Sequence, residues 1–214
     1  MTAPSNVTTL FLAGARTIAE AISGPAIEAA WDAPSVLEDQ LVSSVAGHLA
    51  RSGVWVLDEY LQAGPATGPA DFRSAGEYFC AVAAAAGPEA RKAVRDRGAA
   101  VAELGREGVL SRVNEHLGSL EAEIGRLPGS YLITIIGGKV MTLSDYLATR
   151  VVEQAVHLDD LARSVGHETW ALPEGHEALA IDVAVEMACR LHGPTATVRG
   201  LYRRGFADLV FPVL

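Results

Sequence analysis

The sequence predicts an all-α fold, a bundle of amphipathic helices with one small β-hairpin. Apolar residues recur at helical spacing in several long segments. Alanine is abundant, whereas aromatic residues make up 6% of the chain, which favours packed helices over a sheet sandwich. Pairs of glycine and proline separate the segments. Half of the 214 residues are hydrophobic, which is ample for a core.

Length and charge restrict the domain organisation and the partners. A chain of 214 residues predicts one domain with a modest appendage, here a bundle over residues 1–192 and a C-terminal extension over residues 193–214. The net charge of -9 argues against binding to nucleic acid or to an anionic membrane surface. The start of the chain lacks a secretory signal, and no apolar run reaches the roughly 18 residues of a membrane span. We therefore expect a cytoplasmic protein.

The first half of the chain contains the first predicted helices. In order, they cover residues 7–23, 25–31, 37–61 and 71–86, the last with Asp71 as its N-cap. His48 lies in the inward stripe of the helix over residues 37–61. From this helix alone, a hydrogen-bonded core histidine is the simpler interpretation.

The next segment predicts a long helix over residues 89–127, kinked near Gly105 or Gly108. Its charges, such as Arg95 and Asp96, alternate in sign and indicate a solvated face. His116 lies beside the apolar stripe and is most simply a surface residue. A small β-hairpin is expected over residues 131–143, where β-branched and apolar runs flank a Gly-Gly turn.

The helix predicted over residues 142–165 is the one around which the chain is organised. Thr142 and Asp145 form a capping box at its start. The helix carries Tyr146, Arg150, Glu153 and His157 beside an apolar stripe. A further helix is expected over residues 176–191, and the tail favours one more short helix.

Glu153 and His157 are candidate metal ligands. Residues four apart on a helix lie on one face with Cβ atoms about 5–6 Å apart, and a carboxylate with an imidazole suits a divalent metal. A third ligand must come from elsewhere. Metal sites in helical bundles use inward side chains from facing helices, which makes His48 a candidate partner.

The neighbouring polar residues leave two interpretations open. Arg150 either contacts an anionic substrate or hydrogen-bonds to the candidate metal ligands, or it makes an ordinary surface contact, such as an ion pair with Glu153 or stacking on Tyr146. Tyr146 either points its hydroxyl at a pocket or fills the end of the bundle. Asp159 and Asp160 either accept a hydrogen bond from a ligand histidine or form an exposed acidic pair.

The two cysteines, Cys80 and Cys189, match no metal-ligand spacing. The simpler interpretation is two buried apolar residues in a reducing compartment. A disulfide or a nucleophilic Cys80 is the alternative.

The chain resembles the mycothiol-dependent maleylpyruvate isomerase family within the DinB-like metalloprotein superfamily. The strongest matching segments are HLARSGVWVL at residues 48–57 and LSDYLATRVVEQAVHLDDLA at residues 143–162. The resemblance implies a DinB-like four-helix up-down-down-up bundle with the hairpin before the fourth core helix. It also implies a metal triad of His48, Glu153 and His157, an actinobacterial cytosol, and mycothiol as cosubstrate. A homodimer is compatible with it, since the superfamily often forms dimers.

The implied triad suggests a chemistry. Two imidazoles and a carboxylate form the donor set of catalytic zinc sites, and nickel, iron or manganese also accept these ligands. A thiol at the open position would lose its proton and could add to an electrophilic substrate. We expect an isomerase or an S-transferase, in which Arg150 and Tyr146 are the candidate catalytic residues. The alternative is a non-catalytic metal- or thiol-binding regulator or sensor, which the short C-terminus favours.

Overall fold

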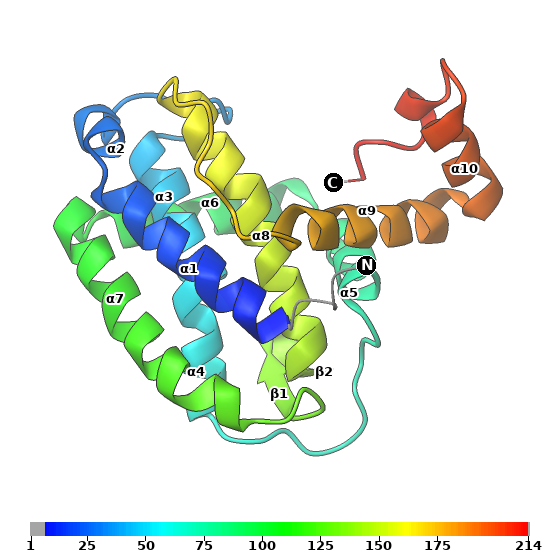
Figure 1. The fold of residues 1–214 in the computed structure, drawn as a ribbon, viewed down its shortest axis with the longest axis horizontal. Helices are drawn as coiled ribbons and strands as arrows, with labels where there is room; N and C mark the ends of the chain where they lie inside the picture. The colour runs from blue at the N-terminus through cyan, green and yellow to red at the C-terminus, as the bar shows by residue number, and fades with distance from the viewer. Residues whose placement is uncertain (1–6, 214) are drawn as a thin grey trace.

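The computed structural model describes residues 7–213. Its first helices are α1 Val7–Ser23, α2 Pro25–Ala30, α3 Val42–Ala50, α4 Val56–Gln62 and α5 Ala75–Ala85. They are followed by α6 Pro88–Ala102, α7 Gly105–Glu123, β1 Leu132–Ile135, β2 Lys139–Thr142, α8 Leu143–Ser164, α9 His176–His192 and α10 Pro194–Tyr202 (Figure 1). The all-α, DinB-like bundle with one antiparallel hairpin is confirmed. Residues 1–6 of the predicted bundle domain lie outside the described residues, and the division at residue 192 stays a prediction.

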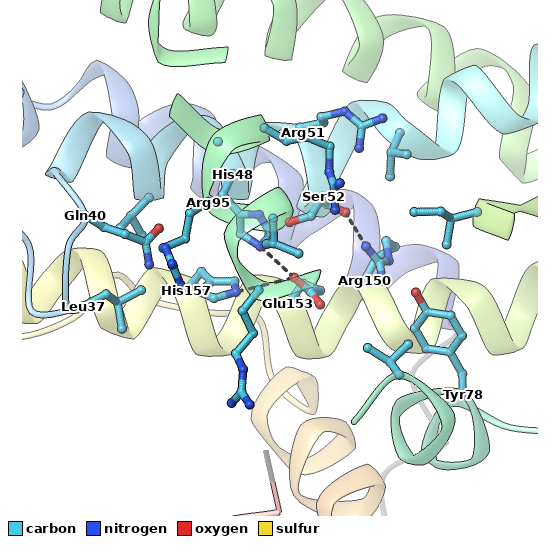
Figure 2. A pocket seen from close by; sticks show the side chains of 18 of the residues that line it. Leu37, Gln40, His48, Arg51, Ser52, Tyr78, Arg95, Arg150, Glu153 and His157 are labelled. Carbon is cyan, nitrogen blue, oxygen red and sulfur yellow. Dashed lines mark hydrogen bonds and ion pairs between the residues drawn. The ribbon is translucent and has the colours of Figure 1, made fainter. Parts of the chain in front are cut away.

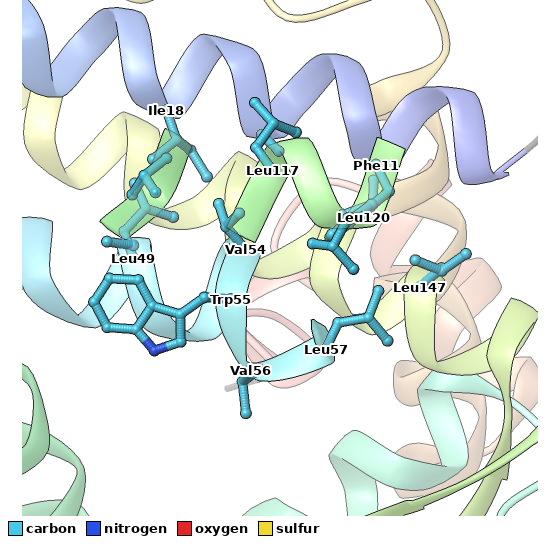
Figure 3. Close-up of a cluster of buried hydrophobic side chains, with 14 of the residues drawn as sticks. Phe11, Ile18, Leu49, Val54, Trp55, Val56, Leu57, Leu117, Leu120 and Leu147 are labelled. Carbon is cyan, nitrogen blue, oxygen red and sulfur yellow. The ribbon is translucent and has the colours of Figure 1, made fainter. Parts of the chain in front are cut away.

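The main core lies between α1, α3, α7 and α8. Figure 3 shows part of it, with Phe11 and Ile18 from α1, Leu49 from α3, Leu120 from α7 and Leu147 from α8. All five side chains are almost completely buried. Burying such a side chain contributes roughly 1.5–3 kcal/mol, so these four elements hold one another in place.

A smaller apolar cluster joins α5 and α9 to α8. It is formed by residues of α5, α8 and α9, namely Ala75, Phe79, Val152, Val183 and Met187. In Figure 1, α9 leads from this contact to α10, which lies on the side of the molecule away from α1 and α7. No helix in the described part of the chain is long and apolar enough to cross a bilayer.

The helix α6 lies directly on α3 through two glycines. A Cβ atom on Gly47 would be 2.5 Å from the carbonyl oxygen of Gly98, and one on Gly98 would be 2.6 Å from that of Ser44. Both distances are too short for any side chain. The glycines therefore permit backbone contact, which places the charged helix α6 beside the helix that carries His48.

The second long helix begins at Val42, and the prediction of residue 37 was wrong. Residues 33–42 form a closed turn instead. The N–H of Ser35 donates to the carbonyl of Gln40, and the N–H of Val42 donates to that of Ala33, both at 2.9 Å. Asp39 has a φ of 57°, which a right-handed helix does not allow.

The prediction that Asp71 is a helix N-cap was also wrong. The helix α5 is capped by Ser74, whose Oγ accepts a hydrogen bond from the N–H of Glu77 at 3.1 Å. The Asp71 carboxylate accepts from the N–H of Val140 at 2.8 Å and from Lys139 Nζ at 3.0 Å. Asp71 therefore ties the preceding loop to the hairpin.

The other predicted boundaries agree with the structure. The helix predicted over residues 89–127 divides into α6 and α7 at Gly105, which has a φ of 69°. Thr142 caps α8 by accepting from the N–H of Asp145 at 3.1 Å, and it donates its hydroxyl to the Asp145 carboxylate at 2.6 Å. The capping box and the kink are confirmed.

A π-helix, Arg51–Trp55, joins α3 to α4. The carbonyl of Ser52 accepts a hydrogen bond from Arg150 Nη1 at 3.0 Å, and the carbonyl of Gly53 accepts from Gln154 Nε2 at 2.8 Å. Both donors belong to α8. The π-helix and α8 are therefore joined by buried polar contacts in addition to apolar packing.

Gln154 extends this contact to two more helices. Its Nε2 also donates to the carbonyl of Phe11 on α1 at 3.1 Å, and its Oε1 lies 2.9 Å from His176 Nε2 at the start of α9. Because Oε1 can only accept, His176 carries its proton on Nε2. Both side chains are completely buried, and burial lowers the pKa of His176 to about 4.

This low pKa predicts a loss of stability in mild acid. Between pH 6.5 and pH 4, His176 is protonated in the unfolded chain but neutral in the folded chain. Protonation therefore stabilises the unfolded state, and the free energy of unfolding falls as the pH falls. From pH 7 to pH 5 we expect His176 to contribute a loss of about 2 kcal/mol. His176→Gln retains an N–H donor but does not titrate. Urea unfolding at both pH values should therefore show a smaller loss in the variant, and equal losses would contradict the assignment.

Candidate metal centre

Two elements bring the predicted ligands together. His48 lies near the end of α3, one turn before the π-helix, and Glu153 and His157 lie one turn apart on α8. The contacts of Arg150 and Gln154 with the π-helix hold these two elements face to face. Figure 2 shows the three side chains converging, with both imidazoles directed at the Glu153 carboxylate.

The distances within this triad suit a metal ion. Glu153 Oε2 lies 3.3 Å from His48 Nε2 and 3.5 Å from His157 Nε2, and one ligand atom from each residue lies within 4.8 Å of the others. Two ligands about 2.1 Å from a tetrahedral zinc ion are about 3.4 Å apart. The donor set is also that of catalytic zinc sites. The predicted triad therefore has the composition and spacing that a divalent metal requires.

Asp160 orients one of the histidines. Its Oδ2 lies 2.9 Å from His157 Nδ1, so the Nδ1–H of His157 donates to the carboxylate and the ring is held with Nε2 toward the triad. Such a carboxylate is the usual partner of a metal-binding histidine. Asp160 is buried, whereas Asp159 is exposed. The interpretation of both residues as an exposed acidic pair was therefore wrong for Asp160.

The charges of the triad depend on one another. Burial alone would raise the pKa of Glu153, but hydrogen bonds from His157 and His48 and the charge of Arg150 hold it well below its usual range. Burial would lower the pKa of His157, but its bonds to Asp160 and Glu153 raise it to about 9. Burial lowers the pKa of His48, which its bond to Glu153 only partly offsets. At neutral pH a proton on His157 thus occupies the place that a metal would take.

Arg150 is buried, so its interpretation as a surface residue was wrong, although the stacking on Tyr146 that belonged to this interpretation is confirmed. It is 5% exposed, its Nε donates to Thr149 Oγ1 at 3.0 Å, and its Nη1 donates to the carbonyl of Ser52. The guanidinium carbon lies 4.7 Å from the centre of the Tyr146 ring.

Tyr146 supports Arg150 and lines the same cavity. Its ring packs edge to face with that of Tyr60 at 5.6 Å, and the side chain is 2% exposed. Burial raises the pKa of Tyr146, so its hydroxyl stays protonated at neutral pH. The structure therefore places both candidate catalytic residues beside the triad.

A cavity of about 530 Å³ opens next to the triad. Its walls come from α3, α5, α6 and α8, and its lining includes all five predicted site residues, which are His48, Tyr146, Arg150, Glu153 and His157. The exposed fractions of the three triad side chains are 18–21%. Small molecules could therefore reach the triad from the cavity.

The cavity is also lined by residues that local sequence patterns did not identify. Tyr78 from α5 and Arg91 and Arg95 from α6 are among them (Figure 2 labels Tyr78 and Arg95). Burial raises the pKa of Tyr78, which leaves it a proton donor at neutral pH. The arginines had been assigned to a solvated face. The feature of the sequence that could have indicated the packing of α6 against α3 was the presence of a glycine in each helix, Gly47 and Gly98, where the two backbones touch.

His116 is buried and belongs to a separate polar cluster, and its interpretation as a surface residue was wrong. Its Nδ1 lies 2.7 Å from Asp58 Oδ2. Ser119 Oγ and Gln62 Nε2 also donate to the Asp58 carboxylate, at 2.8 Å and 3.0 Å. These bonds satisfy a buried carboxylate on α4, and they hold α4 against α7.

The two cysteines take no part in the triad or in a disulfide. Cys80 and Cys189 are both free thiols of intermediate exposure. Burial raises the pKa of the Cys80 thiol, which disfavours the nucleophilic thiolate. Because both thiols are only partly buried, the interpretation of the cysteines as two buried apolar residues was wrong on burial.

Comparison with known proteins identifies the family of the chain. Residues 11–162 match the family model of the mycothiol maleylpyruvate isomerase N-terminal domain, and this segment contains the complete triad. Neither the curated proteins nor the solved structures gave a match. Because the match covers well over half of the sequence, the chain belongs to the family of the mycothiol maleylpyruvate isomerase N-terminal domain.

Proposed function

We propose that this protein is a divalent-metal-dependent enzyme that uses a small thiol, either an isomerase or an S-transferase. The observation that carries the proposal is that the His48–Glu153–His157 triad opens onto a cavity of about 530 Å³. Among the described residues, this cluster consists of three side chains. Three protein ligands leave a coordination position for a substrate, whereas a structural site closes it with a fourth.

The donor set favours zinc, and nickel, iron or manganese would also accept two imidazoles and one carboxylate. A metal bound there would stabilise the thiolate form of a thiol at its open position. Family membership supports mycothiol as that thiol. The use of mycothiol would place the protein in an actinobacterial cytosol, and a homodimer is a further expectation from the superfamily.

The surrounding residues have separate tasks in this proposal. Asp160 holds the His157 ring in its binding orientation. When a thiolate adds to an electrophilic double bond, negative charge develops on the substrate, and the guanidinium of Arg150, which lines the cavity, would stabilise that charge. Tyr146 holds the guanidinium of Arg150 in position. Tyr78, from α5, offers a protonated hydroxyl beside Arg150.

The proposal predicts the metal content of the wild type and of three variants. After loading with zinc and desalting, the wild type should retain one equivalent by elemental mass spectrometry, and His48→Ala and His157→Ala should each retain almost none. His192→Ala, which changes an exposed histidine at the end of α9, should match the wild type. Failure of the wild type to retain zinc, nickel, iron or manganese would contradict the proposal.

The same proteins distinguish an enzyme from a sensor. Zinc-loaded wild type should convert an electrophile such as maleylpyruvate only when mycothiol is present, and His157→Ala should not. Binding of metal and mycothiol without turnover of maleylpyruvate or of other electrophiles would instead support the non-catalytic alternative.

The contact between Asp160 and His157 makes a second prediction. Asp160→Asn keeps the size of the side chain but removes the negative acceptor, so zinc affinity should fall by about 10–100-fold. Asp159→Asn is the matched control, because Asp159 is the exposed neighbour. Competition with a chromophoric chelator measures both affinities. Equal losses in the two variants would show that general charge, and not the hydrogen bond, is responsible.

A further inference from the structure

A second, more apolar cavity adjoins the cavity of the triad. It also has a volume of about 530 Å³, and we call it the alanine groove because Ala85, Ala86 and Ala90 line it at the turn between α5 and α6. It shares part of its wall with the triad cavity, including Leu37, Gln40, Val82, Arg91, Val94 and Arg95. A ligand can therefore extend from one cavity into the other.

The alanine groove has two valine side chains that are partly exposed to solvent. Val82 is 42% exposed and Val94 is 38% exposed, and they reach the groove from α5 and α6. Their neighbours are alanines, which are too short to fill the space. Such an apolar concave surface next to a polar site is typical of a binding site for a small amphipathic molecule.

Two arginines lie on the wall that the cavities share. Arg91 and Arg95 are four apart on α6 and therefore project from the same side of the helix. Neither forms an ion pair within the described residues, although Lys92 on the same helix pairs with Asp96 at 2.7 Å. Glu38 is the one acidic residue among those that line the groove. In a chain of net charge -9, two unpaired cations at this junction indicate an anionic ligand.

We propose that the substrate of this site is a carboxylic acid with an apolar substituent. Its carboxylate binds Arg91 and Arg95 at the junction of the two cavities, and its apolar part lies in the alanine groove along Val82 and Val94. This inference names the substrate class and rests on the proposed function only for the reaction at the triad. Binding of the acid itself requires neither metal nor thiol.

A chain-length series tests the inference on the full protein. Acetate, butyrate, hexanoate and octanoate are titrated into the wild type by isothermal titration calorimetry. Each methylene that enters the groove should tighten binding by up to about fourfold. Octan-1-ol, which has the same chain but no charge, should bind at least tenfold more weakly than octanoate.

Two pairs of variants locate the binding site. Val82→Glu should abolish the dependence on chain length, whereas Val198→Glu, at a comparably exposed valine on α10, should retain it. Arg95→Gln should weaken octanoate binding at least tenfold, whereas Arg126→Gln, at an exposed arginine after α7, should not. Circular dichroism checks that each variant is folded. If a variant does not fold, the chain-length series on the wild type still tests the inference.

Three results would overturn the inference. They are equal affinities for acetate and octanoate, equal affinities for octanoate and octan-1-ol, and a dimer that Val82→Glu converts to a monomer in light scattering. The last would mean that a second copy of the chain covers the groove. Repeating the series with His48→Ala separates this inference from the proposed function. Dependence on chain length in a protein without metal supports the groove alone, and metal binding without that dependence supports the triad alone.

Discussion

The structure depends on the buried contact between α8 and the π-helix. Arg150 and Gln154 lie four apart on one face of α8 and donate to the carbonyls of Ser52 and Gly53. Polar groups buried in this way are costly unless they are hydrogen-bonded, so the two elements have one register in which all of these groups are satisfied. His48 lies one turn before the π-helix, and Glu153 directly precedes Gln154. The contact that holds the bundle together therefore also fixes the spacing of the triad.

The electrostatics of the cavity differ from those of the whole chain. The protein has a net charge of -9, yet the lining of the triad cavity contains Glu153 as its one acidic residue and several arginines, among them Arg91, Arg95 and Arg150. Such a concentration of one charge in a concave site attracts ligands of the opposite charge. A bound divalent metal would add to it. A thiolate and a carboxylate substrate would together balance the charge, which links the proposed chemistry to the proposed ligand class.

Local patterns predicted the helices, the capping box at Thr142 and the pair Glu153 and His157, because each depends on residues close together in the sequence. The pairing of His48 with them depends on tertiary packing, and it followed from the resemblance to a family. The π-helix could not be predicted from a pattern that assumes 3.6 residues per turn. His116 seemed exposed because its partner Asp58 lies on a different helix. The arginines of α6 were assigned to solvent because alternating charge does not reveal what a helix covers.

The most direct test of this account is anomalous diffraction from crystals soaked in zinc, recorded above and below the zinc absorption edge. The account predicts one strong anomalous peak within bonding distance of His48 Nε2, Glu153 Oε2 and His157 Nε2, with an open side toward the cavity. A peak elsewhere, or no peak while His48 and Glu153 remain hydrogen-bonded, would contradict it. The triad would then be a buried polar contact between two helices.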